Sequence, residues 1–161
     1  MLKKITKIFC ILTIFVISNR NVISEEVYEL KTNKVLNSNN EEEYLQINDY
    51  KLLIKSGDEE NILNKNLVYK LSNSQENNIL LAGHNNNVVF NRIYRLKIGD
   101  EILLYSNNVK HTYTVMERRC IKVNDVSIYN NETNSKKLVL ITCTNDNQKR
   151  FIVDAVEKKG A

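Results

Sequence analysis

The feature that most constrains the fold is the stretch 137–156, in which two apolar runs flank a short polar connection. The first run, residues 138–142, ends at Cys143, and the second, residues 151–156, follows Arg150. Both runs are rich in β-branched residues and bounded by polar sequence, a pattern typical of β-strands. Because a short connection between neighbouring strands normally forms an antiparallel hairpin, we expect the thiol and the guanidinium to lie close together. Such a pair can serve chemistry, since a cation activates a thiol and can hold an oxyanion, but a packed hairpin with an incidental Cys and Arg explains the same pattern.

The first 24 residues differ from the rest of the chain. Three lysines precede an apolar run over residues 8–17 that is interrupted only by Thr13, and no acidic residue occurs before Glu25. A basic segment followed by an apolar one is typical of a secretory signal peptide or a short membrane anchor. The run is shorter than the roughly 20 residues that span a membrane, and residues 22–24 resemble a cleavage site only weakly. Both alternatives stay open, with the anchor favoured, and a polar linker is expected over residues 25–43.

The charge of the chain excludes one class of partner. The net charge is +4, from 23 basic and 19 acidic residues, but residues 1–24 hold four of the basic residues and no acidic one. The remaining chain is therefore balanced, with 19 residues of each sign. A nucleic-acid-binding domain usually carries a basic excess, so no nucleic-acid partner is expected.

The part from residue 44 to residue 161 reads as one domain of short strands. Short helices are expected after the capping signal at residues 56–58, over residues 88–96 and over residues 124–131. The chain has no Pro and four Gly, so turns must rely on Asn, Asp and Ser. Short strands at regular spacing with little helix favour a mainly β fold, a closed eight-stranded barrel with two or three short helices. The predicted strands are residues 44–47, 51–54, 67–71, 78–82, 101–105, 110–123 and the two runs of the hairpin.

Cys120 and Cys143 are the two cysteines of the predicted domain. They can pair in an exported protein, but so few cysteines do not make a disulfide scaffold, and we expect both thiols to be free. Of the two histidines, His111 lies among polar neighbours and is interpreted as an exposed strand residue. His84 ends a fully apolar strand directly after Gly83, where its imidazole can stand free.

A cysteine and a sequence-distant histidine form a candidate nucleophile pair. In this interpretation His84 protonates a leaving amine and Arg150 holds the oxyanion that develops when Cys143 attacks a carbonyl. Two alternatives use the same residues differently. One is a cysteine hydrolase of the same fold that releases its product, and the other is a non-catalytic barrel that binds a surface peptide.

Residues 44–158 resemble the sortases, the cysteine transpeptidases of Gram-positive bacteria. The resemblance rests on residues 81–84 (LAGH), residues 96–101 (LKIGDE), residues 139–143 (VLITC) and Arg150 with the Phe-Ile-Val strand after it. The order His, Cys, Arg is also that of the family. Val139 departs from the family, which usually has Thr there, and the connection from Cys to Arg is short and lacks Pro. These departures leave the subclass open.

The resemblance implies an eight-stranded barrel with the site at one rim. It also implies cleavage of an LPxTG-like sorting signal near the C-terminus of a surface protein, through a thioester on Cys143. Transfer to an amine from a cell-wall precursor or a pilin lysine would follow. The catalytic residues implied are His84, Cys143 and Arg150, and the substrate-binding residues are Ile141, Thr142 and Asn85.

This chemistry requires no metal or organic cofactor. Some sortases bind calcium through acidic loops, but the acidic clusters at residues 41–43 and 58–60 are interpreted here as solvated faces. The protein is expected at the extracytoplasmic face of the cell membrane, held by residues 1–24, or secreted if that segment is cleaved. The loop over residues 144–149 is expected to tune the choice of substrate. The sequence leaves the oligomeric state open.

Overall fold

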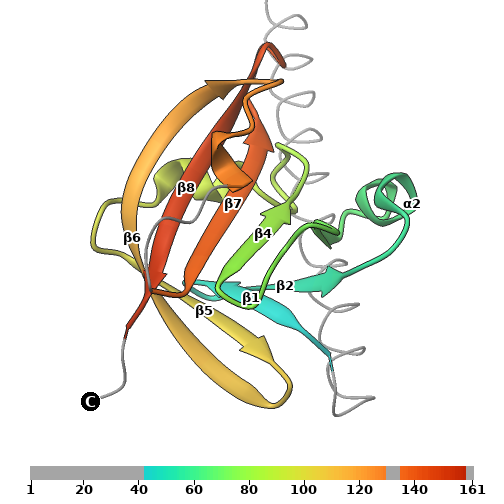
Figure 1. Cartoon of the computed structure of the whole chain (residues 1–161). Helices are drawn as coiled ribbons and strands as arrows, with labels where there is room; N and C mark the ends of the chain where they lie inside the picture. The colour runs from blue at the N-terminus through green and yellow to red at the C-terminus, as the bar shows by residue number, and fades with distance from the viewer. Residues whose placement is uncertain (1–41, 130–134, 159–161) are drawn as a thin grey trace, which may run out of the picture.

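The computed structural model describes residues 42–129 and 135–158 (Figure 1). The predicted leader, residues 1–24, lies outside the described residues, as does all but the end of the predicted linker, residues 25–43. Within the described part, no helix is long and apolar enough to cross a membrane.

Eight strands close into a barrel, which confirms the predicted fold class. Their order around the barrel is β1-β2-β3-β4-β7-β8-β6-β5. Neighbouring strands are antiparallel except β2–β3 and β4–β7, which are parallel. The strands are β1 (Tyr44–Ile47), β2 (Tyr50–Lys55), β3 (Val68–Lys70), β4 (Asn78–Ala82), β5 (Glu101–Ser106), β6 (Val109–Lys122), β7 (Lys137–Cys143) and β8 (Lys149–Glu157).

Two apolar clusters lie on opposite faces of the barrel wall. The larger fills the interior and takes residues from all eight strands, for example Leu81, Leu140 and Val153. The smaller lies on the outer face of β4, β7 and β8 and includes Leu80, Ile141 and Ile152. Because successive side chains of a strand point to opposite faces, this division fixes the face on which each residue of these strands lies.

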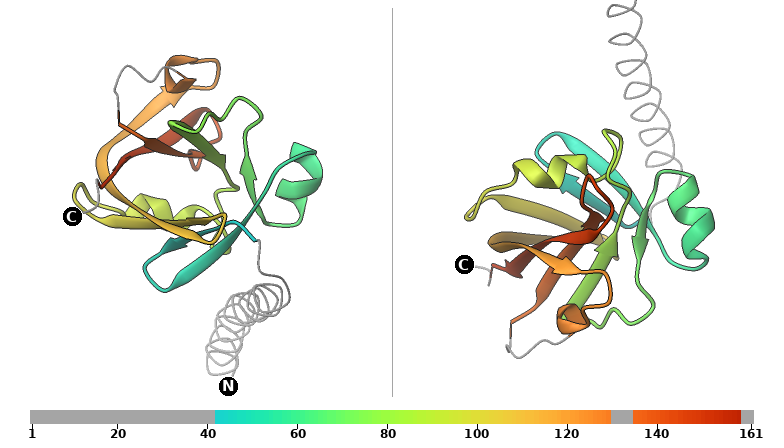
Figure 2. Two further views of the ribbon diagram at one scale, coloured as in Figure 1. Left: turned by 60° about the horizontal axis from the view of Figure 1, so that its bottom comes forward. Right: turned by 90° about the horizontal axis from the view of Figure 1, so that it is seen from above.

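Three short helices complete the described fold. The helix α2 (Glu59–Asn64) begins at Asp58, whose side chain accepts a hydrogen bond of 2.8 Å from the backbone N–H of Asn61, and it lies outside the barrel beside β3 (Figures 1 and 2). The 3₁₀ helix η1 (Asn91–Arg95) follows β4, and η2 (Ser127–Tyr129) follows β6. All three were predicted as short helices or helical connections.

Asparagine supplies the left-handed residues of the turns, as the composition predicts. Among the residues that the structure describes, five non-glycine residues have positive φ and all are asparagines: Asn48, Asn66, Asn107, Asn108 and Asn147. Asn tolerates this region because its short side chain bonds the local backbone. Asn147 lies in the connection from β7 to β8, so this chemistry also shapes the loop beside Cys143.

Both acidic clusters were interpreted as solvated faces, and this interpretation is wrong for the cluster at residues 41–43. Glu42 and Glu43 form ion pairs of 2.8 Å with Lys55 and 3.0 Å with Lys70, and their side chains are only 14% and 23% exposed. These contacts attach the start of the described chain to β2 and β3. The second cluster, residues 58–60, is exposed as expected.

Candidate active site

The predicted hairpin exists and aligns Cys143 with Arg150. These two residues are Cα partners in the antiparallel β7–β8 pair. The connection between them is closed by its own hydrogen bonds: the backbone N–H of Thr144 donates to the carbonyl of Lys149 at 3.0 Å. Hydrogen bonds from Thr144 and Gln148 lower the pKa of Asp146, so this loop holds a carboxylate in its charged form. The loop is therefore a compact turn.

His84 reaches the same edge of the barrel through the parallel β4–β7 pair. Ala82 is the Cα partner of Ile141, and His84 and Cys143 each follow two residues later. The backbone N–H of Gly83 continues the pairing with a 3.1 Å hydrogen bond to the carbonyl of Ile141. Since neighbouring strands are about 4.8 Å apart, this register places the histidine beside the cysteine.

Strand alternation puts the three predicted catalytic residues on one face. Along β4, every second residue points to the outer face: Leu80 belongs to the outer apolar cluster, Ala82 packs against it, and His84 is the next residue of this series. Cys143 shares its face with Ile141, as Arg150 does with Ile152. The site therefore lies on the outer face at the edge of the barrel, directly beyond this cluster. His84 is exposed, whereas the cysteine and the arginine are half-buried.

On the inner face, the residues that precede His84 and Cys143 fix the backbone of the two strands. Thr142 is 2% exposed, and its hydroxyl donates to the carbonyl of Gly83 at 2.8 Å. A Cβ atom on Gly83 would lie 2.8 Å from side-chain atoms of both Val89 and Phe90, so only glycine fits there. The residue before the histidine and the residue before the cysteine are thus locked to each other.

Tyr94 is the residue at this site that sequence reasoning missed. Its hydroxyl donates to the carbonyl of Cys143 at 2.9 Å, and its ring stacks on Phe151 with centroids 4.2 Å apart. Burial, followed by the charges of Cys120, Cys143 and Asp146, raises its pKa, so the phenol stays protonated as a donor. The signal in the sequence was only a helical pattern with Ile93 inward. Nothing in that pattern specified the partner of the neighbouring tyrosine.

The three predicted substrate-binding residues lie in three different environments. Ile141 is 8% exposed in the outer cluster, and Thr142 is closed off with its hydroxyl engaged. Asn85 is half-buried, and its side-chain amide donates to Asn145 Oδ1 at 2.9 Å, which joins the loop after β4 to the β7–β8 loop. Contact of these residues with a substrate stays a prediction.

The two cysteines of the barrel are both free, as predicted. Cys120 pairs with Phe151 of β8, whereas Cys143 pairs with the neighbouring residue, Arg150. Because neighbouring residues of a strand point to opposite faces, the two thiols lie on opposite faces of the barrel wall.

The interpretation of His111 as an exposed residue is wrong, because it is half-buried with Nδ1 2.5 Å from Glu157 Oε1. Among residues 42–129 and 135–158, no three His, Cys, Asp or Glu side chains gather as metal ligands.

Comparison with known proteins agrees with this geometry. The family model of the sortase domain matches residues 45–158. The chain is similar to Sortase A of Bacillus anthracis, with 32% identity over 107 residues that make up 63% of this chain and 50% of that protein. The matched part thus spans about half the length of this curated relative.

Solved sortase structures share the fold. The sortase D5 transpeptidase of Clostridium perfringens is 26% identical, with a TM-score of 0.66 over 81% of this chain and 89% of that one. Sortase C of Streptococcus pneumoniae is 21% identical, with a TM-score of 0.68 over 76% and 72% of the two chains. Because the family model covers nearly all of the barrel, the chain belongs to the sortase family.

Proposed function

We propose that this protein is a cysteine transpeptidase that cuts a C-terminal sorting signal of a surface protein and transfers the new acyl end to an amine. The observation that carries the proposal is the register of β4, β7 and β8. It aligns Cys143 with Arg150 in one pair and brings His84 to the same edge in the other. A nucleophile, a proton carrier and an oxyanion donor on one face are the parts that acyl transfer needs.

In the proposed reaction, the thiol of Cys143 gives its proton to His84 as the sulfur attacks the carbonyl carbon of the scissile amide. Arg150 donates to the oxygen as it gains charge, and His84 gives a proton to the leaving amine as the C–N bond breaks. A thioester then joins the enzyme to the substrate. An incoming amine attacks the same carbon and gives up its proton to the imidazole. The C–S bond then breaks, and the released sulfur takes that proton back from His84. No atom beyond the two substrates is consumed.

The surroundings of Cys143 support a fixed nucleophile. Tyr94 holds its carbonyl and Thr142 holds the strand behind it, so the backbone that carries the thiol is bound from two sides. A geometry held before the substrate arrives lowers the entropic cost of attack. Membership of the sortase family also supports a transpeptidase of the cell surface. The sortase D5 of Clostridium perfringens is a transpeptidase, and the sortase C of Streptococcus pneumoniae has pilin substrates.

The test is a mass spectrum of the full chain after incubation with a peptide that carries an LPxTG-like signal. We expect a covalent adduct on Cys143, lost in Cys143→Ala and kept in Cys120→Ala. Cys120 is a matched control because it is the other free thiol of the barrel and is more exposed. An adduct on Cys120 alone would refute the proposed nucleophile. Absence of an adduct from the unaltered protein would favour the non-catalytic barrel.

A second measurement separates transfer from hydrolysis. With the adduct formed, an added amine such as triglycine should yield a ligated peptide faster than water yields the free acid. If the amine leaves the product ratio unchanged, the protein is a hydrolase and the acceptor part of the proposal fails.

A further inference from the structure

One segment of the chain links the backbone of His84 to that of Cys143. The carbonyl of His84 accepts hydrogen bonds from the backbone N–H groups of Asn86 at 2.9 Å and Phe90 at 3.0 Å, so the chain turns back directly after the histidine. The helix η1 follows this turn, and near its end the hydroxyl of Tyr94 donates to the carbonyl of Cys143 at 2.9 Å. The same segment therefore contacts the main chain of both residues.

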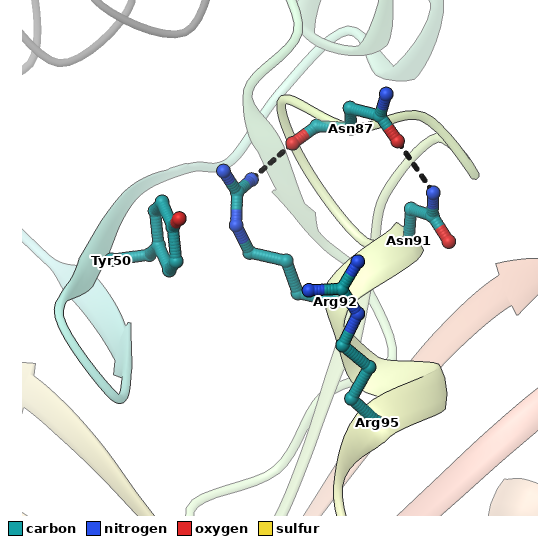
Figure 3. Close-up of a pocket in the computed structure, with 5 residues that line it drawn as sticks. All are labelled: Tyr50, Asn87, Asn91, Arg92 and Arg95. Carbon is teal, nitrogen blue, oxygen red and sulfur yellow. Dashed lines mark hydrogen bonds between the residues drawn. The ribbon is translucent and has the colours of Figure 1, made fainter.

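This segment, residues 84–96, is called the brace below, and its first half is attached to the barrel on its outer side. The guanidinium carbon of Arg92 lies 3.4 Å from the centroid of the Tyr50 ring, at the start of β2 (Figure 3). The side-chain amide of Asn91 donates to Asn87 Oδ1 at 2.6 Å, which closes the turn before η1 (Figure 3). These contacts fix the start of η1, whereas Tyr94 lies close to its end.

Arg118 of β6 binds the end of the brace. The carbonyl of Tyr94 belongs to the last turn of η1, where carbonyls lack a partner within the helix. The N–H group three residues further on, that of Lys97, donates instead to Asp100 Oδ2 at 2.8 Å. Arg118 Nη2 donates to the carbonyl of Tyr94 at 2.8 Å. The strand β6 thus supplies the hydrogen bond that the helix does not make for itself.

The guanidinium of Arg118 also lies over the aromatic ring that supports Tyr94. Its carbon is 5.5 Å from the centroid of the Phe151 ring, which in turn stacks on the Tyr94 ring with centroids 4.2 Å apart. The register explains this position, because Arg118 is the Cα partner of Val153, a residue of the interior cluster two positions from Phe151. A planar guanidinium suits both contacts, since it donates at its edge and lies over a ring with its face.

We propose that Arg118 is a positioning residue of the active site, which holds the main chain of Tyr94 so that the Tyr94 hydroxyl stays on the carbonyl of Cys143. The inference rests on the proposed transpeptidase function. Arg118 contributes no group to the chemistry and acts through Tyr94, by keeping the nucleophile in place before the substrate arrives.

The test is a double-mutant cycle with the full chain and the LPxTG-like peptide. Arg118→Met keeps an unbranched stem and removes the guanidinium. We expect the limiting rate of adduct formation on Cys143 to fall about threefold, and the peptide concentration at half-saturation to stay unchanged. In the Tyr94→Phe background the same substitution should have no further effect, because the contact through which Arg118 acts is already gone.

Two variants serve as controls. Arg118→Lys keeps a charged donor, so its limiting rate should lie between those of Arg118→Met and the unaltered protein. Lys110→Met removes the same charge from an exposed position near the other end of β6 and should leave the rate unchanged. A threefold loss that recurs in the Tyr94→Phe background, or in Lys110→Met, would overturn the inference. A change in half-saturation alone would mean that Arg118 binds the peptide itself, which also overturns it.

Hydrogen exchange tests the same contact without turnover. In Arg118→Met, the amides of the β7–β8 loop, residues 144–149, should exchange faster, because the carbonyl of Cys143 is held less firmly. Unchanged exchange in this loop would overturn the inference. If the unaltered protein forms no adduct, the proposed function has failed, and the exchange rates alone then decide the role of Arg118.

Discussion

Tyr94 shows how much one hydroxyl can contribute to holding the nucleophile. In Tyr94→Phe the ring keeps its stack on Phe151, whereas the hydrogen bond to the carbonyl of Cys143 is lost. A bond of this kind contributes about 1 kcal/mol, so we expect the rate of adduct formation to fall roughly threefold to tenfold. Rapid-quench mass spectrometry measures that rate. The matched control is Tyr105→Phe, which keeps a stack on Tyr44 in the β1–β5 pair; an equal loss there would contradict a specific role for Tyr94.

Gly83 is constrained by space. Its missing side chain makes room for Val89 and Phe90, both fully buried. Overpacking of such a site costs about 1–3 kcal/mol, and relief by backbone movement would displace His84, the next residue. We expect Gly83→Ala to lower the midpoint of urea unfolding and to slow adduct formation. An unchanged midpoint and rate would show that the neighbouring side chains yield freely.

At the scale of whole strands, a buried carboxylate joins β8 to both of its neighbours. Asp154 is 4% exposed, with Arg119 of β6 on one side and Lys137 of β7 at 2.8 Å on the other. Burial and then the charge of Arg119 lower the pKa of Lys137. Asp154→Asn would remove the buried carboxylate that pairs with half-buried Lys137, and it would leave half-buried Arg119 with the 60%-exposed carboxylate of Glu117. We therefore expect a loss of about 3 kcal/mol in the free energy of unfolding.

An exposed ion pair supplies the control for that measurement. Glu76 is 91% exposed at its side chain and lies 3.5 Å from Lys136. Such a pair contributes less than about 1 kcal/mol, so Glu76→Gln should barely change the urea midpoint. If both variants lose the same stability, the buried triad is no more important than a surface contact.

The elements of this fold were largely predictable, but their pairing was not. Apolar, β-branched runs between polar segments located all eight strands to within one or two residues, because each run buries at least one face and the runs of β7 and β8 bury both. The hairpin of β7 and β8 followed from its short connection. The parallel pairing of β4 with β7 joins segments more than 50 residues apart, and only closure of the barrel selects it. That pairing carries His84 to Cys143, so the residues of the site were found by motif while their arrangement, and the role of Tyr94, required the fold.

For the molecule as a whole, closure by the β1–β5 pair leaves no open sheet edge in the described barrel. Closed barrels need no further strand to cover an edge. Among the described residues, the interior cluster begins at Leu45. The barrel should thus fold and react independently of the residues that precede Glu42.

Two truncations test this independence. A protein that starts at Glu42 keeps the ion pairs of Glu42 with Lys55 and Glu43 with Lys70, so its Tm and its rate of adduct formation should match those of the full chain. A protein that starts at Leu45 loses both pairs and the stack of Tyr44 on Tyr105. Each kcal/mol lost shifts the Tm of a domain this size by roughly 4 °C, so the shorter protein should melt several degrees lower. A large drop already in the protein that starts at Glu42 would mean that the preceding residues stabilise the barrel.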